Sequence, residues 1–187
     1  MLKDVLERIL EHYLDESQSD FKNNDLASYI RHEGAYSLEQ ALGKRGIGLA
    51  FEGSPGRGQW ATVPWLAVFN PNITTSAQSE YYIVYLFSAD FQQVHLSMNQ
   101  GTTAVEKEFK ARANGILAHR ADLIRRRVPE YSDEFSGEPI HLASSRELPA
   151  GYEAGHAFGK TYNRLSIPDI DELAADLGKM VGLYLTL

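Results

Sequence analysis

Apolar residues near the N-terminus recur at spacings of three and four, which is the pattern of an amphipathic helix. The positions that predict a helix over 2–16 are Leu2, Val5, Leu6, Ile9, Leu10 and Tyr13. A shorter run of the same kind predicts a second helix over 24–32. From about residue 45 the pattern changes to short segments rich in β-branched and aromatic residues, which predict strands at 47–51, 62–69, 81–88 and 93–98. Turn sequences between these segments favour a meander of antiparallel neighbours.

The second half of the chain begins with a helical pattern over 104–127, which Thr102 or Thr103 can cap and Pro129 ends. Two short segments, 139–143 and 151–158, have the composition of strands. A last amphipathic stretch begins near Pro168 and predicts a C-terminal helix. The parts of the chain are therefore a helical part at about 1–44, a sheet core at about 45–100, the long helix, and a C-terminal part at about 139–187.

These elements predict a single domain over 1–187 of the α+β class. The expected architecture is a mainly antiparallel sheet, free to curve strongly, with flanking helices on one side. No repeat, low-complexity tract or long linker divides the chain. Its 187 residues suffice for one domain with a substantial core and are few for two.

Composition and charge narrow the setting in which this domain works. The absence of cysteine excludes disulfides and thiolate metal sites. No apolar run approaches the roughly 18 residues that cross a bilayer, and the N-terminus is unlike a secretory signal, so we expect a cytoplasmic protein without a membrane partner. The net charge of -7 argues mildly against a nucleic-acid partner, but residues 101–127 carry seven bases against three acids. Local potential decides where a polyanion binds, so this segment is either a phosphate contact or an ordinary solvated face.

Familiar catalytic and cofactor motifs are missing from the chain. The glycine-rich segment 53–58 lacks the Gly-Lys-Ser/Thr ending of a nucleotide-binding loop, and a strand follows it where a helix would be needed. His141 and His156 form at most a ligand pair without a third partner. No nucleophile elbow is present, and the carboxylates do not cluster as nuclease sites require. We therefore predict no catalytic residue, no metal and no cofactor.

Both tryptophans of the chain, Trp60 and Trp65, lie within six residues beside the glycine-rich loop at 53–59. Such a loop packs little apolar surface, so it suits a contact role. Aromatic rings at its base offer flat faces on which a planar ligand can stack. Pro64 removes a ladder donor, which favours a sheet edge or a bulge at this point. Simple packing explains Trp60, whereas core packing and a ligand pocket both remain open for Trp65.

The strand predicted over 81–88 presents Tyr82 and Leu86 on one face and Tyr81 and Tyr85 on the other. A tyrosine-rich strand is usually a half-buried part of a sheet. If this strand pairs with the one that carries Trp65, then Tyr82 and Leu86 wall the same cavity.

Several ordered blocks of sequence form a larger pattern that covers most of the chain. They are Gly56-x-Gly58-x-Trp60-Ala61-x-Val63-Pro64-Trp65-Leu66-Ala67-Val68-Phe69, Ser76-Ala77-Gln78, Tyr81-Tyr82-Ile83-Val84-Tyr85-Leu86-Phe87, Val94-His95-Leu96-Ser97-Met98-Asn99-Gln100-Gly101, Tyr152-Glu153-Ala154-Gly155-His156, and an ending with Leu173, Asp176, Leu177 and Tyr184. This pattern resembles the McrB-like N-terminal domain. The resemblance implies a non-catalytic DNA-recognition module of modification-dependent (type IV) restriction systems, which act against invading phage DNA.

The resemblance also implies a mode of recognition. Such a module binds duplex DNA that contains 5-methylcytosine or a related modified cytosine, and it turns that base out of the helix into a pocket. The nuclease and the AAA+ GTPase motor of these systems are expected in another domain or subunit. Arg57 stands where the best-known family member has a tyrosine near the extruded base, which leaves the manner of extrusion in this chain open.

Three groups of residues follow from the resemblance. The modified-base pocket is expected to contain Trp65, Tyr82 and Leu86. The expected residues of the DNA-contacting loop are Ser54, Gly56, Arg57, Gly58 and Gln59. Lys44 and Arg45 are expected to add phosphate contacts.

Two functions of other classes stay open at this point. A protein-interaction or assembly domain of a defence system would dock a partner chain on the surface around Trp60 and Trp65 without reading bases. An unrecognised nuclease would cut DNA when supplied with magnesium or manganese. Titration with methylated and unmodified duplexes separates DNA recognition from assembly, because phosphate contacts make DNA binding steeply dependent on salt.

Overall fold

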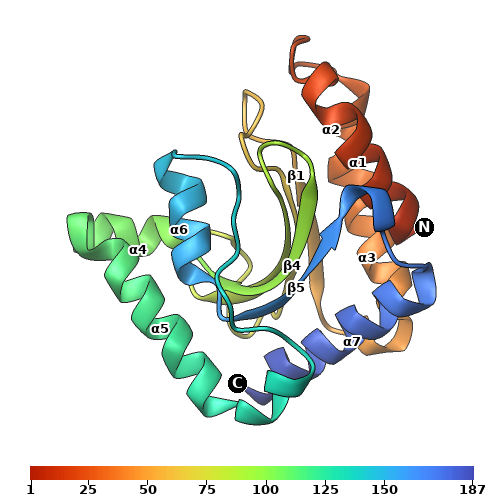
Figure 1. Cartoon of the computed structure of the whole chain (residues 1–187). Coiled ribbons are helices and arrows are strands. Elements are labelled where there is room, and N and C mark those ends of the chain that lie inside the picture. The colour runs from red at the N-terminus through yellow and green to blue at the C-terminus, as the bar shows by residue number, and fades with distance from the viewer.

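The computed structural model describes all residues, 1–187, and its centre is a five-stranded antiparallel sheet (Figure 1). The strands are β1 (Ala50–Ser54), β2 (Trp65–Phe69), β3 (Tyr81–Phe87), β4 (Gln93–Gln100) and β5 (Phe158–Asn163). They lie side by side in chain order, and every neighbouring pair is antiparallel. The α+β class and the antiparallel sheet with flanking helices are therefore confirmed.

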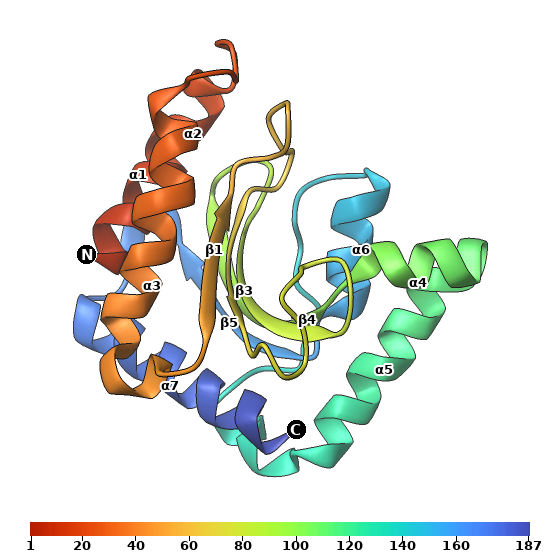
Figure 2. The same ribbon diagram turned by 180° about the vertical axis from the view of Figure 1, so that it is seen from behind.

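The sheet curves strongly and carries helices on both faces, so the expectation of helices on one side is wrong (Figures 1 and 2). The reason lies in β3, in which every residue after the first is buried, so both faces of the sheet need a cover. The convex face packs in one core with α1 (Leu2–Glu16) and α7 (Ile170–Thr186). The concave face packs in a second core against the segment 139–142 and α6 (Glu147–Gly155).

The helical N-terminal part begins with α1, which has the bounds predicted from the sequence, 2–16. The second helical run is longer than the predicted 24–32. It comprises α2 (Asp25–Tyr29), the π-helical turn η1 (Ile30–Gly34), α3 (Ala35–Leu42) and the 3-10 turn η2 (Gly43–Gly46). A side chain at Gly34 would meet the Leu66 side chain at 2.5 Å, so this glycine lets the helical run pass close to the sheet.

Strand positions agree with the prediction in β3 and β4 and shift in β1 and β2. β1 starts at Ala50, because η2 and the left-handed Gly48 (φ +84°) occupy the residues before it. β2 starts at Trp65, because Pro64 has no N–H to give to the ladder. The Pro64 carbonyl still accepts a hydrogen bond from the Phe87 amide at 3.3 Å.

The helix predicted over 104–127 is interrupted. It consists of α4 (Thr102–Phe109), the short turn η3 (Lys110–Arg112) and α5 (Ala113–Arg127). Lys110 has a φ of +53°, which a continuous α-helix does not allow. The break turns α5 away from α4, and both helices pack on α6 (Figure 1).

Two strand predictions in the C-terminal part are wrong. Residues 139–143 form no strand, and most of 151–158 belongs to α6, with β5 beginning only at its last residue. Before 139, a single bridge joins Ser136 to Gly159, so this part of the chain only touches the sheet edge. The 3-10 turns η4 (Pro129–Asp133) and η5 (Arg164–Ser166) complete the elements.

The C-terminal helix α7 begins after Pro168, as predicted, and the Asp169 carboxylate caps it by accepting from the Glu172 amide at 2.9 Å. Its buried face crosses the convex side of the sheet near β3 and β4 (Figure 2). None of the helices combines the length and the apolar composition that crossing a membrane requires.

Candidate functional site

The loop between β1 and β2, residues 55–64, is held firmly at its base. The Tyr13 hydroxyl of α1 donates to the Pro55 carbonyl at 2.9 Å and lies 2.8 Å from the Ala61 carbonyl. Trp60 packs edge-on against the rings of Tyr13 and Phe21, each at 5.2 Å, and its indole N–H donates to the Ser19 carbonyl. Trp60 is therefore a packing residue that ties the loop to the N-terminal helices.

The tip of this loop is open to solvent. Arg57, Gly58 and Gln59 are exposed, and their backbone amides donate to no acceptor within the protein. Gly56 has a φ of +123°, and a Cβ there would meet the Gln59 carbonyl oxygen at 2.0 Å. Gly58 has a φ of +70° with open space around it. The loop thus presents free amide donors on a backbone that is fixed behind them.

The two glycines of the loop make a matched pair of substitutions. We expect Gly56→Ala to lower the free energy of unfolding by about 2–3 kcal/mol, because both the backbone angle and the Gln59 carbonyl oppose a side chain. Gly58→Ala should cost only about 1 kcal/mol, since the backbone angle alone opposes it. Urea denaturation of both variants measures the difference, and equal losses would contradict this account of the loop.

The first strand residue after the loop, Trp65, belongs to a row of side chains that crosses the whole sheet. Ser54 pairs with Trp65, Trp65 with Leu86, Leu86 with His95, and His95 with Thr161. Directly paired residues point to the same face, so the structure brings Trp65 and Leu86 together on the concave face, at the end of the sheet next to the loop.

Tyr82 lies on the same concave face, four residues from Leu86 along β3 and hence roughly 14 Å away. Its ring contacts Phe69 at 5.4 Å, and its hydroxyl donates to the Ala77 carbonyl at 3.2 Å. Between the two rows of large side chains runs a row of small ones: Ala67, Val84, Ser97 and Gly159. The concave face is therefore shaped as a depression with Trp65 and Leu86 at one end and Tyr82 at the other.

This depression is filled by the protein itself. Ile140 and Leu142 of the irregular segment 139–142, and Tyr152 of α6, pack into it. The exposed fraction is 9% for Trp65, 1% for Tyr82 and 0% for Leu86. The predicted pocket residues are thus gathered on one face and closed to solvent.

Tyr152 is a part of this cluster that the sequence did not single out. Burial raises its pKa to about 12, and the neighbouring Trp65 acts in the opposite direction. The phenol therefore stays neutral in the cluster that it shares with the indole. In the sequence, Tyr152 belongs only to a block that resembles the family. The prediction of a strand over 151–158 gave no indication that Tyr152 lies on a helix.

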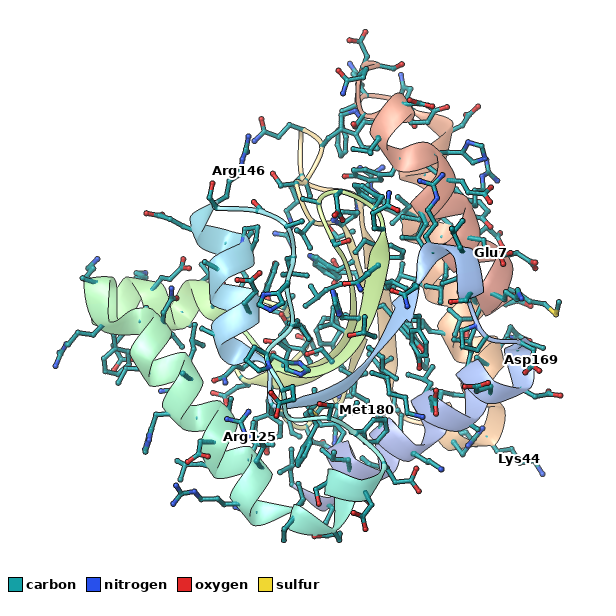
Figure 3. The ribbon with its side chains drawn as sticks, in the orientation of Figure 1. Glu7, Lys44, Arg125, Arg146, Asp169 and Met180 are labelled. Atoms are coloured by element: carbon teal, nitrogen blue, oxygen red, sulfur yellow. The ribbon has the colours of Figure 1, made fainter.

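The structure does not bring Lys44 and Arg45 to the loop. They lie in η2, before β1, whereas the loop follows β1, so the strand separates them by roughly 17 Å. The Arg45 guanidinium donates to the Ala174 carbonyl of α7. Figure 3 shows Lys44 at the end of the molecule opposite Arg146, which lies at the start of α6 near the loop end.

The family model described as "MrcB-like, N-terminal domain" matches residues 8–187, nearly the whole chain. The chain belongs to this family. No curated protein matches the chain. The matched range of this MrcB-like domain includes the loop, α6 and the concave cluster, by which we mean Trp65, Tyr82, Leu86, Ile140, Leu142 and Tyr152.

The MrcB-like domain also has a polar half on its concave face, along β4 and β5. His95 lies between the Thr161 hydroxyl (2.8 Å) and the His141 carbonyl (3.1 Å), and His156 lies 2.7 Å from the Ser97 hydroxyl. Because the His141 carbonyl only accepts, Nε2 of His95 carries the proton and Nδ1 accepts from Thr161. Burial lowers the pKa of both imidazoles, that of His156 to about 4 with help from Arg125 and His95. No group of three potential ligands forms around them.

The buried His156 makes the stability of this MrcB-like domain depend on pH. Its pKa is about 4 in the folded chain against about 6.5 when unfolded, so between these values the unfolded chain binds the additional proton. Stability is therefore lost as the pH falls through this window, by about 2 kcal/mol between roughly pH 7 and pH 5. Urea denaturation across this range tests the expectation, with His156→Gln as the control that should flatten the profile. An equally steep loss in His156→Gln would contradict it.

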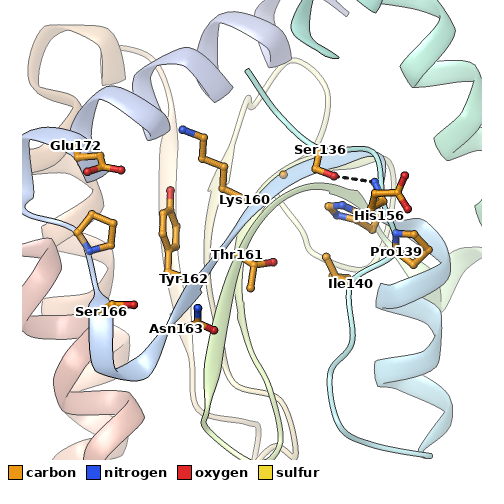
Figure 4. A pocket seen from close by; sticks show the side chains of 13 residues that line it. Ser136, Pro139, Ile140, His156, Lys160, Thr161, Tyr162, Asn163, Ser166 and Glu172 are labelled. Carbon is orange, nitrogen blue, oxygen red and sulfur yellow. Dashed lines mark hydrogen bonds between the residues drawn. The ribbon is translucent and has the colours of Figure 1, made fainter. Parts of the chain in front are cut away.

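A separate cavity of about 480 Å³ lies beside the outer edge of β5 (Figure 4). Its polar groups are largely paired within the protein. Lys160 Nζ and the Tyr162 hydroxyl both donate to the buried Asp176, at 2.5 Å and 2.8 Å. These pairs attach α7 to the sheet. The side chains around the cavity therefore have a structural role, and the cavity is not part of the candidate site.

Proposed function

We propose that this MrcB-like domain recognises modified cytosine in duplex DNA by base flipping and performs no catalysis itself. The observation that carries the proposal is the concave cluster at the loop end of the sheet. It combines the Trp65 indole and the Leu86 side chain, beside a loop with free amide donors, with the Tyr152 phenol and with the Tyr82 phenol at the far end of the depression. Membership of the family supports it. The bound DNA would be handed to a nuclease or a GTP-driven motor carried by another domain or subunit.

A small number of contacts must offset the free energy that base extrusion costs. Extruding a base costs a few kcal/mol of stacking and pairing. Stacking on an aromatic ring returns about 1–3 kcal/mol per base, and burial of the cytosine methyl adds about 0.8 kcal/mol. Trp65 and Tyr82 are suited to the stacking and Leu86 to the methyl. Because the methyl adds so little, the shape of the depression must exclude the other bases.

The proposal requires the segment over the depression to move. This segment is anchored by three hydrogen bonds, in which the Ala89 amide donates to the Leu142 carbonyl, the Leu142 amide to Glu153 Oε1, and His95 Nε2 to the His141 carbonyl. An entering base would displace Ile140 and Leu142 and replace their apolar contacts with its own ring. Closure in the free protein keeps the rings out of water until DNA arrives.

Arg57 at the loop tip is the residue best placed to act near the vacated position in the duplex. Its planar guanidinium can stack on bases or hold a phosphate in a two-point contact. A tyrosine would offer stacking and one hydroxyl donor, without the positive charge. The loop, with Ser54 and the amides at 57–59, is proposed to hold the DNA backbone on either side of the extruded base.

Binding of a panel of duplexes that differ at one cytosine tests this function. We expect tighter binding to the methylated duplex than to the unmodified one, with affinity falling steeply as salt rises. Equal affinity for all duplexes would overturn modified-base recognition, and the absence of salt-dependent DNA binding would favour the assembly domain. Incubation of the same duplexes with magnesium or manganese should leave them intact, and cleavage would favour the nuclease.

A further inference from the structure

A second feature near the loop is a hollow of about 270 Å³ between the N-terminal helices and the end of β1. Three basic side chains line it: Arg31 and His32 from η1, and Arg57 from the loop tip. The other lining residues are Phe51, Glu52, Gly53, Ser54, Pro55 and Gly56. The hollow has the volume of about nine water molecules at roughly 30 Å³ each, which is room for a phosphate group with part of its hydration shell.

These basic side chains are not used by the fold to neutralise acids. Arg31, His32 and Arg57 are exposed, and none lies within 4.0 Å of a carboxylate, although Glu52 lines the same hollow. In contrast, Arg126 pairs with Asp122 on α5, and Arg125 donates to the His156 and Ala157 carbonyls. The three basic groups beside the loop thus have no acidic partner in the protein, whereas Arg125 and Arg126 are engaged within it.

Two of the three groups are also oriented by their neighbours. The Arg31 guanidinium lies over the Phe21 ring, 5.1 Å from its centroid, which restrains a long side chain. His32 Nδ1 lies 2.9 Å from the Ser28 carbonyl, so this nitrogen donates, and Nε2 can donate to a phosphate oxygen when the ring carries both protons. Behind them, Gly56 donates its amide to Ser54 Oγ, and the amides of Arg57 and Gly58 stay free.

We propose that Arg31, His32 and Arg57, with the free loop amides, form a binding site for one phosphodiester group of the DNA backbone. This site rests on the proposed function, because its ligand is the strand from which the base is extruded. Ser54 lines the hollow and pairs with Trp65 across β1 and β2, so the site and the concave depression begin on adjacent strand residues. A phosphate held here would fix the backbone next to the mouth of the depression. Arg57 would contribute from the loop and Arg31 from the helical side.

Alanine substitution of the two arginines, singly and together, tests the site. Phosphate contacts carry no sequence information, so Arg31→Ala and Arg57→Ala should each weaken binding about tenfold, equally for methylated and unmodified duplexes. Because one phosphate carries one charge, the slope of log affinity against log salt concentration should fall by about 0.9 in the double variant, and by less in each single variant, which keeps one arginine at the phosphate. Lys179→Ala is the matched control, since it removes one exposed positive charge on α7, the helix that packs on the convex face of the sheet.

The outcome separates this site from the proposed function. Thermal unfolding first confirms that each variant is folded, as expected for exposed side chains. If the parent discriminates between duplexes and the slope of the double variant equals that of Lys179→Ala, the phosphate site is overturned and base recognition stands. If the parent binds all duplexes equally while the double variant loses about 0.9 from the slope, base recognition is overturned and the phosphate site stands.

Discussion

Trp65→Ala should abolish the preference for methylated over unmodified duplex while leaving the affinity for unmodified duplex within about threefold. The indole is the stacking surface at the loop end of the depression, and stacking worth about 1–3 kcal/mol corresponds to roughly 5- to 150-fold in affinity. Phosphate contacts from the loop do not involve the ring, so the salt-dependent part of binding should persist. Fluorescence anisotropy with the two duplexes at several salt concentrations measures both quantities.

The control for this prediction must separate stacking from folding. Trp65 is only 9% exposed, so truncation to alanine also removes about 3–5 kcal/mol of packing. Trp65→Leu keeps an apolar side chain without a ring and should remain folded while losing discrimination. Trp65→Phe keeps a smaller ring and should retain part of it. A folded Trp65→Leu variant with the parent's selectivity would remove Trp65 from the proposed pocket.

Asp176→Ala should lower the free energy of unfolding by about 3–5 kcal/mol, as much as the loss of packing at Trp65. The carboxylate is buried on α7 and accepts from Lys160 Nζ and from the Tyr162 hydroxyl. Its removal leaves a cation and a phenol without their acceptor at the junction of α7 and β5. Urea denaturation at neutral pH measures the loss.

Tyr85→Phe provides the contrast for this prediction. The Tyr85 hydroxyl is the buried side-chain polar atom that finds no hydrogen-bond partner. Deleting it should leave stability unchanged or raise it by about 1 kcal/mol, since an unsatisfied buried group is costly. If Asp176→Ala costs no more than Tyr85→Phe, the anchoring of α7 through Asp176 is wrong.

The sequence was informative about elements whose patterns are long or strongly periodic. The helix 2–16, the strands from 81 to 100 and the C-terminal helix follow from apolar spacing, because each buries one regular face. The interrupted helix at Lys110 was not predictable, since a positive φ at a lysine is fixed by packing rather than by the residue. The segment 139–143 has strand-like composition but lies over the sheet instead of within it, a tertiary arrangement that local sequence does not encode.

The candidate site was predictable to a similar extent. Alternation placed Tyr82 and Leu86 on one face, and the pairing of Trp65 with Leu86 fulfils the condition for a shared surface. The closure of that surface by Ile140, Leu142 and Tyr152 was not foreseen, because it depends on contacts between residues more than fifty positions apart in the chain. Arg31 and His32 were equally hidden, since a π-helical turn brings them to a loop formed much later in the sequence.

Extrusion of the modified base is the central claim, and a fluorescent base analogue tests it most directly. The emission of 2-aminopurine is quenched inside the DNA stack and rises when a neighbouring base leaves it. Placed next to the target cytosine, it should brighten when the domain saturates the methylated duplex, and stay quenched on the unmodified duplex at equal occupancy. A methylated duplex that is fully bound and still quenched would contradict base flipping by this protein.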